Sequence, residues 1–343
     1  MQFEKRALYK FNMPYALGTF VRNGQTCVVA ATEDEGEIVV VPPPYTRAEV
    51  LVAGPGGCMS LVSHPEFPGE LYAIMGCFLG YNFHGGALYR IATLGASVVS
   101  TKVAELPFAH RMEIVEKAGQ LYLLLANLAS TKDSPADWSR AGALYAAALT
   151  NPADQKWILT PVLENLHKNH GFLKCQFLGR PTVLVSGTEG VFELDLSAPG
   201  AGWNFVRLLA HEVSEVAVFD LDGDGREELI TIEPFHGNVL AVYKASDSGW
   251  NKVWEAQLNF GHCVLAGTVA GKPSVLVSNR AGDKDLLLFQ FAKTGPAALR
   301  PSRFVVESGV GAANMLFMVH EGQELILATN QTQGELVRYE LKL

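Results

Sequence analysis

Short apolar runs rich in Val, Ile and Leu alternate with glycine-containing turns along the whole chain, and no long segment has the apolar period of a helix. Apolar strands such as 182–186, 274–278 and 324–328 directly follow tight turns. These turns recur at 22–25, 117–120, 178–180, 270–272 and 321–323. A polar turn, a third strand and a fourth strand, which often follows Trp or Pro, complete each unit. The pattern predicts an all-β protein built from repeated four-stranded units.

The repeat divides the chain into seven units that average 49 residues. The units are 12–54, 55–106, 107–165, 166–210, 211–258, 259–308 and 309–343. The seventh unit supplies only three strands, and residues 2–11 form a spare strand that would complete it. We therefore expect one domain over residues 1–343, a seven-bladed β-propeller whose last blade is closed by the N-terminal strand. Six or eight blades remain possible, because insertions in units two and three blur the count.

Composition narrows the class of protein. The net charge is −8 and the basic residues are scattered, so no basic stripe indicates a nucleic-acid partner. No run of about 18 apolar residues predicts a membrane span, and the first residues lack the apolar region of a signal peptide. The five cysteines are widely spaced without a CxxC pair, which favours free thiols in a reducing compartment. We expect a cytoplasmic protein, and nothing indicates its oligomeric state.

Histidines recur at equivalent positions of the repeat. In a propeller, the connection into each inner strand and the turn between the second and third strands lie around one mouth of the central channel. The inner strands of units three to six are expected to start with His110, His170, His211 and His262, three of which precede a turn glycine by nine residues. His84 and His236 fall in second-to-third turns of the same mouth, each within a Phe-His-Gly phrase.

Three or four imidazoles that converge from different units favour a divalent transition metal such as zinc, manganese, iron or nickel, with open positions left for a substrate, and the sequence leaves open whether all six converge. Without a metal, the same groups can serve as general acid or base. The alternative is structural, because repeat proteins reuse a bracing residue at equivalent positions. Units one and seven carry Tyr15 and Ala313 instead, which shows that the repeat does not require His there.

Other polar residues are candidates by their position at the same mouth. They are Tyr81, Glu189, Glu233, Asn279, Arg280 and Asn330. The acidic turn 32–36 is expected to be a solvated hairpin tip. The insertion 127–141 contains Trp138 and Arg140, which would suit a sugar ring or an anion, although a disordered tip fits as well.

An acidic loop in unit five has the composition of a calcium site. Its carboxylates alternate before a glycine that permits a sharp turn, and a plain Asp/Gly turn is the alternative. The predicted ligands are Asp220, Asp222, Asp224 and Glu228. Because the loop joins the first and second strands, it would lie on the face opposite the histidines and be structural.

This loop and its flanking strands resemble the FG-GAP/VCBS repeat of β-propellers. The stretch from His211 to Arg280 also resembles the propeller part of aldos-2-ulose dehydratase and related bacterial proteins. The phrases that carry this resemblance are 220–225, 233–237, 260–262 and 279–280. The resemblance implies a metal-containing propeller that dehydrates and isomerises keto-sugars, with His211, His236 and His262 in its pocket.

We therefore expect a metal-assisted lyase, dehydratase or isomerase that acts on a small sugar or keto-sugar. The expected catalytic residues are His170, His211, Glu233, Tyr81 and Arg280. A non-catalytic ligand- or protein-binding propeller is the first alternative, since the fold does not imply a function. A metal-dependent polysaccharide lyase is the second alternative.

Overall fold

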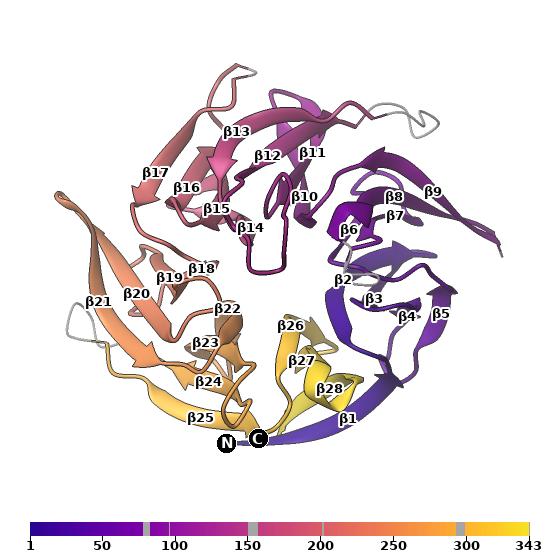
Figure 1. Cartoon of the computed structure of the whole chain (residues 1–343). Helices are drawn as coiled ribbons and strands as arrows, with labels where there is room; N and C mark the ends of the chain where they lie inside the picture. Colours follow the sequence, from indigo (N-terminus) through magenta and orange to yellow (C-terminus); the bar gives the residue numbers. More distant parts are fainter. Residues whose placement is uncertain (78–82, 96, 150–156, 201, 293–298, 343) are drawn as a thin grey trace.

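The computed structural model describes residues 1–77, 83–95, 97–149, 157–200, 202–292 and 299–342. Seven four-stranded antiparallel sheets stand around a central channel (Figure 1). The described part of the chain has no α-helix, only the short 3₁₀ helices η2 (Phe83–Gly85) and η3 (Gln331–Gln333). It also offers no helix with the length and apolar character that crossing a membrane requires. The predicted seven-bladed β-propeller is confirmed.

The strands of each blade follow one another outward from the channel. The inner strands are β2 (Pro14–Arg22), β6 (Ser60–Ser63), β10 (Ala109–Lys117), β14 (Gly171–Phe177), β18 (Glu215–Phe219), β22 (Gly261–Val269) and β26 (Ala312–His320). The second strands are β3 (Gln25–Thr32), β7 (Glu70–Met75), β11 (Gln120–Asn127), β15 (Arg180–Gly187), β19 (Glu228–Glu233), β23 (Lys272–Asn279) and β27 (Gln323–Asn330). The third strands are β4 (Ile38–Val41), β8 (Ala87–Leu94), β12 (Gly142–Ala148), β16 (Gly190–Asp195), β20 (Val239–Ser246), β24 (Leu286–Gln290) and β28 (Glu335–Lys342). The outer strands are β5 (Glu49–Val52), β9 (Ser97–Glu105), β13 (Thr160–Leu166), β17 (Phe205–Leu209), β21 (Gly249–Gln257), β25 (Ser302–Glu307) and β1 (Gln2–Lys10).

The N-terminal strand closes the ring. β1 pairs antiparallel with β28 from Gln2 opposite Lys342 to Lys10 opposite Glu335, so the last blade combines both ends of the chain. Figure 1 shows the two termini side by side at the rim. This pairing covers the β28 edge, which would otherwise expose unpaired backbone groups.

The hydrophobic core lies between neighbouring blades. The second and third strands are buried on both faces, which explains their continuous apolar runs, as in β4 and β7. One cluster joins Phe20 and Val29 of the first blade to Leu71 and Ile91 of the second, and corresponding clusters join the other neighbours. Each fully buried side chain of this kind contributes roughly 1.5–3 kcal/mol. All five cysteines are free thiols, and Cys175 alone among them is partly accessible.

Tight turns connect the inner and second strands on the face away from the histidines. Asn23 and Gly24 have φ of 52° and 74°, which a two-residue type I′ turn requires at both positions. Leu178 and Gly179 adopt the same pair of conformations, with φ of 49° and 78°. These turns fix the length of each inner strand, and therefore the level at which its first residue enters the opposite mouth.

Candidate metal centre

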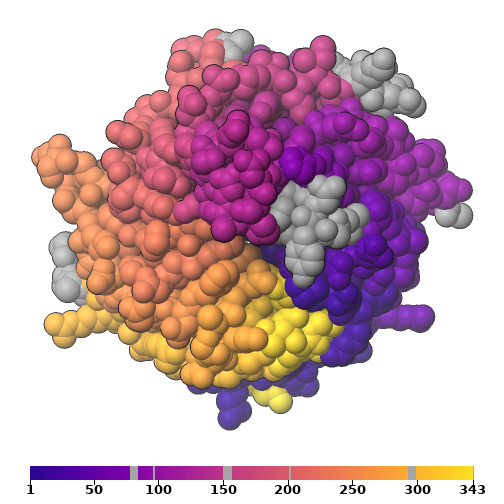
Figure 2. Space-filling view, in the orientation of Figure 1, coloured from indigo at the N-terminus to yellow at the C-terminus, as the bar shows by residue number. Residues whose placement is uncertain are grey.

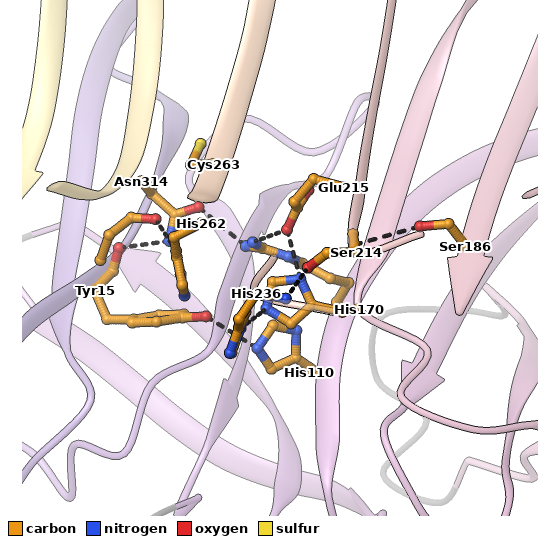
Figure 3. Close-up of polar contacts among 12 residues, drawn as sticks. Tyr15, His110, His170, Ser186, Ser214, Glu215, His236, His262, Cys263 and Asn314 are labelled. Carbon is orange, nitrogen blue, oxygen red and sulfur yellow. Dashed lines mark hydrogen bonds and ion pairs between the residues drawn. The ribbon is translucent and has the colours of Figure 1, made fainter. Parts of the chain in front are cut away.

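Four histidines lie together at one mouth of the channel (Figure 3). His110 is in β10, His262 is in β22, and His170 directly precedes β14. Because neighbouring inner strands contact one another around the ring, residues at equivalent strand starts converge. The fourth, His236, comes from the turn between β19 and β20, where its φ of 47° directs the chain sharply.

The imidazoles of His170, His236 and His262 form a group that can hold a metal ion. One ring nitrogen of each lies within 4.8 Å of the others, and the two Nε2 atoms of His170 and His236 are 3.2 Å apart. Metal–nitrogen bonds of about 2.0–2.1 Å place tetrahedral ligand atoms roughly 3.3 Å apart. The spacing of His170 and His236 matches that value, and the nitrogen of His262 can complete the set of ligands to one ion.

The far nitrogens of two of these rings lie beside oxygen atoms, and a hydrogen bond fixes the tautomer of one of them, His262. Nδ1 of His262 lies 2.8 Å from the carbonyl oxygen of Ala313, so Nδ1 donates and Nε2 keeps its lone pair. Nδ1 of His170 lies 2.6 Å from Oε1 of Glu215, although at an angle away from that of an ideal hydrogen bond. Both rings thus direct a lone pair to the place where the three nitrogens meet, as metal-binding histidines do.

Glu215 is held in turn by a residue of the third blade, two blades away. Arg111 in β10 donates from Nη2 to Oε1 of Glu215 at 3.2 Å and from Nη1 to Asn314 at 3.1 Å. Asn314 donates to the carbonyl oxygen of Tyr15 at 2.8 Å. This buried network links four blades beneath the histidines, so the orientation of His170 depends on the whole ring rather than on its own blade.

Burial favours the neutral form of three of these imidazoles, those of His110, His236 and His262. It lowers the pKa of His110 and His262 well below 6.5, with neighbouring positive groups adding to the effect. Burial is also the largest cause that lowers the pKa of His236 to about 2, followed by the charge of His170 and then that of Arg280. A neutral imidazole has the free lone pair that a metal ligand needs.

His110 lies beside the three-histidine group and is paired with Tyr15. Their Nε2 and Oη atoms are 2.9 Å apart. Burial raises the pKa of Tyr15, so its hydroxyl stays protonated and donates to Nε2. Nδ1 of His110 then carries the hydrogen and has no hydrogen-bond partner among the described residues. The Tyr15 ring also contacts His262 edge-on.

A pocket of about 240 Å³ opens above the histidines. Its wall combines aromatic and charged side chains from the turns of several blades. Besides the four histidines and Tyr15, the lining residues are Glu33, Leu128, Lys132, Pro135, Trp138, Phe235 and Arg280. The Phe235 ring stacks on His236 with centroids 4.0 Å apart and meets Trp138 at 5.2 Å.

The insertion of the third blade forms part of this wall. Asp137 accepts hydrogen bonds from the backbone N–H groups of Asp133 and Ser139 at 3.0 and 2.9 Å, which lower its pKa to about 2. Lys132 lies over the Trp138 ring, 3.4 Å from its centroid, and donates to the Pro135 carbonyl oxygen. In Figure 2 the magenta part of the chain, which includes this insertion, covers the middle of the face. The insertion therefore lies at the mouth and contributes Lys132, Pro135 and Trp138 to the pocket wall.

The structure corrects the expectation that the acidic turn 32–36 is a plain solvated tip. Glu33 lines the pocket and accepts a hydrogen bond from Nε2 of Gln331 at 2.7 Å. Burial raises the pKa of Glu33, while Arg280 and Gln331 partly oppose that rise. Arg280, a predicted site residue, lies in the same wall.

His211 does not start the inner strand of the fifth blade. β18 begins at Glu215. The backbone N–H of Ser214 donates to the carbonyl oxygen of Ile232, as the backbone N–H of His170 donates to that of Ser186, so Ser214 occupies the position equivalent to His170. The longer connection places His211 beside Glu233, with Nε2 3.2 Å from Oε1. The predicted residues His211 and Glu233 thus lie together, with Tyr243, but neither lines the pocket.

The remaining predicted site residues lie elsewhere. His84 is exposed in η2, where its ring meets Phe108, and is not part of the three-histidine group. Tyr81 lies outside the described residues. Glu189 pairs with His167 at 2.7 Å, and Asn330 donates to Tyr339 at 2.7 Å. Asn279 accepts a hydrogen bond from the backbone of Asn259 and stabilises the turn that carries Arg280.

The acidic loop between β18 and β19 lies on the opposite face, as expected for a turn between first and second strands. Asp220, Asp222 and Asp224 offer carboxylate oxygens within 4.8 Å of one another. Lys244 already forms ion pairs with Asp222, with Asp224 at 2.8 Å and with Glu228 at 3.3 Å. An ammonium group therefore supplies the positive charge that was expected from calcium, and calcium binding itself stays a prediction.

Sequence reasoning missed Arg111 and Glu215 as site residues. The available signal was the sequence position, because Arg111 directly follows His110, and Glu215 directly follows Ser214, which takes the place of His170 in the fifth blade. Two opposite charges at the same level of a narrow channel are expected to pair.

No known protein family matches the chain, and no curated protein matches it. The fold expected from the resemblance to FG-GAP propellers is present, but no relative supports that resemblance or the one to aldos-2-ulose dehydratase.

Proposed function

We propose that this protein is a metal-dependent propeller enzyme that dehydrates or isomerises a small, oxygen-rich molecule such as a sugar or keto-sugar. The observation that carries the proposal is the convergence of His170, His236 and His262 in the wall of one pocket. Two of these rings have their far nitrogens held by Glu215 and Ala313, an arrangement that tunes metal ligands.

The donor set favours zinc, iron or nickel. Imidazole suits these ions, whereas manganese prefers carboxylate and water oxygens. Three protein ligands leave positions open for a substrate, which distinguishes a catalytic from a structural site. A bound ion would polarise a substrate carbonyl and acidify the adjacent carbon–hydrogen bond.

Glu33 is the proton-transfer group that the pocket offers. It lines the cavity, Gln331 fixes one of its oxygens, and burial raises its pKa above the ordinary 4.5, which favours a carboxyl group that can accept a proton and return it. The rings of Trp138 and Phe235 exclude water from one side. The pocket volume of about 240 Å³ fits a small molecule better than a polymer, which weighs against a polysaccharide lyase.

A ligand-binding module is the second candidate. Glu33 is the single carboxyl group in the described pocket wall, and Tyr15 and His110 are already hydrogen-bonded to each other. The wall therefore offers few groups for proton transfer. Such a wall would also suit recognition without turnover.

Deuterium exchange separates the two candidates. The metal-loaded protein is incubated in D₂O with a panel of aldoses, ketoses and their acids, and NMR follows exchange at the carbon next to the carbonyl. We expect exchange with at least one compound, its loss in His262→Gln and Glu33→Gln, and its retention in His320→Gln, whose histidine packs on Tyr45 at the far end of β26. A zinc-, iron- or nickel-loaded protein that binds a panel member without exchange favours the binding module.

A further inference from the structure

Arg280 is a cation in the pocket wall that lacks a fixed partner. Its guanidinium makes no hydrogen bond and no ion pair with any residue that the structure describes, although the side chain is half-buried. The backbone around it is fixed, because Arg280 N–H donates to the Phe260 oxygen at 2.9 Å and Ala281 N–H to the Asn259 oxygen at 3.1 Å. Phe260 lies two residues before His262, so Arg280 is held close to the three-histidine group.

Positive charge exceeds negative charge in the described wall of the pocket. Arg280 and Lys132 face a single carboxyl group, that of Glu33. Glu33 forms no ion pair with Arg280 and accepts a hydrogen bond from Gln331 instead. Beneath the histidines, Arg111 and Glu215 compensate each other. The wall therefore favours an anionic ligand even before a metal adds its charge.

We propose that the ligand of this pocket carries a carboxylate, which binds Arg280 while a neighbouring hydroxyl or carbonyl oxygen faces the three-histidine group. This inference rests on the proposed function and narrows its substrate from sugars in general to small hydroxy or oxo acids. A guanidinium matches the two oxygens of a carboxylate with two parallel hydrogen bonds. The volume of about 240 Å³ and the rings of Trp138 and Phe235 restrict the ligand to a few carbon atoms around those two groups.

Lactate and propane-1,2-diol test the inference, because they differ chiefly in the carboxylate. Binding of each is followed by ligand-observed NMR titration, and metal content is measured on the same samples. The variants are Arg280→Gln, Arg280→Lys and, as a matched control on the same blade, Arg303→Gln, whose exposed side chain lies 3.4 Å from Asp285. Inorganic phosphate is titrated in parallel as the other common anion.

We expect Arg280→Gln to weaken lactate binding about 10- to 100-fold at unchanged metal content, since it removes a charge-assisted pair. Arg280→Lys keeps the charge without the two parallel hydrogen bonds, so its affinity for lactate should lie between those of the wild type and Arg280→Gln. Propane-1,2-diol and the Arg303→Gln control should show no change. Lactate binding that is absent from the wild type, or equal in Arg280→Gln, overturns the inference. Phosphate that binds as tightly as lactate, with the same dependence on Arg280, overturns the choice of a carboxylate.

The result separates this inference from the proposed function. Wild-type protein that holds no metal but binds lactate through Arg280 contradicts the metal enzyme and supports the carboxylate site. Metal-loaded protein whose lactate affinity ignores Arg280 contradicts the carboxylate site and leaves the metal enzyme standing.

Discussion

Nδ1 of His170 lies 2.6 Å from Oε1 of Glu215, and this contact directs the opposite nitrogen of the ring toward His236 and His262. Arg111 holds the same carboxylate oxygen from the other side at 3.2 Å. A buried carboxylate shared between an arginine and an imidazole fixes the orientation of the ring. Glu215 is therefore a positioning residue for the metal site.

Glu215→Gln should weaken metal binding roughly 10- to 100-fold, because the neutral amide no longer supports the His170 ring. Competition with a coloured chelator measures this affinity on folded protein. The variant also leaves Arg111 buried without its charge partner, which costs roughly 3–5 kcal/mol of stability. The double variant Arg111→Met/Glu215→Gln should recover much of that stability but not the affinity. If the double variant recovered metal affinity together with stability, the role of Glu215 would be merely structural.

Glu33 should make both stability and proton transfer depend on pH. Its pKa in the folded protein lies above the ordinary 4.5, chiefly through burial. The folded state therefore binds this proton more tightly than the unfolded state, and the stability it contributes below pH 4.5 is lost as the pH rises through the folded pKa. As the pH rises through the folded pKa, the thermal midpoint of Glu33→Gln should therefore increase relative to that of the wild type.

Proton abstraction by Glu33 needs its ionised form. The rate of deuterium exchange should thus increase as the pH rises through the pKa of Glu33. The Glu33→Gln variant should not show this increase. An unchanged pH profile in the variant assigns the proton transfer to another group.

Lys244 should decide how the acidic loop responds to calcium. Burial alone would lower the pKa of Lys244, but its hydrogen bonds to Asp222 and Asp224 raise it instead. Lys244→Met leaves buried carboxylates unpaired, which costs roughly 3 kcal/mol. Calcium should then raise the thermal midpoint of the variant more than that of the wild type. An equal rise in both proteins means that calcium binds beside the lysine.

Leu178→Asn should stabilise the fold by roughly 0.5–1 kcal/mol, because leucine is held at a positive φ of 49° that asparagine adopts with less strain. Its side chain is exposed, so little packing is lost. Urea unfolding measures the gain, and Leu178→Ala serves as the control that shortens the side chain without relieving the backbone. Equal midpoints for Asn and Ala would rule out the backbone explanation.

The architecture was predictable because each blade repeats its own local signals. The turn glycines that follow each inner strand, such as Gly119 and Gly271, mark the blades, and the apolar runs between them are long enough for one strand each. Closure by residues 2–10 followed from a last unit that lacked one strand. The strands of each sheet fall inside the residue range predicted for that unit, except that β13 extends one residue past its unit, to Leu166.

The site was predictable only where strand register alone decides position. Counting back from the turn glycines located His110, His170 and His262, since all three inner strands have the same length between turn and mouth. The count failed for His211, because the connection before β18 is longer and Ser214 takes the equivalent place. Glu33 was missed because its burial depends on Gln331 of another blade, a contact that local sequence does not reveal.

Metal analysis of purified protein, loaded with zinc and desalted, tests the central claim most directly. The account predicts about one equivalent by inductively coupled plasma mass spectrometry, lost in His170→Gln, His236→Gln and His262→Gln. His211→Gln and His320→Gln should retain it, since neither residue belongs to the three-histidine group. Wild-type protein without bound metal after zinc, iron and nickel loading, or triad variants that retain a full equivalent, would contradict the account.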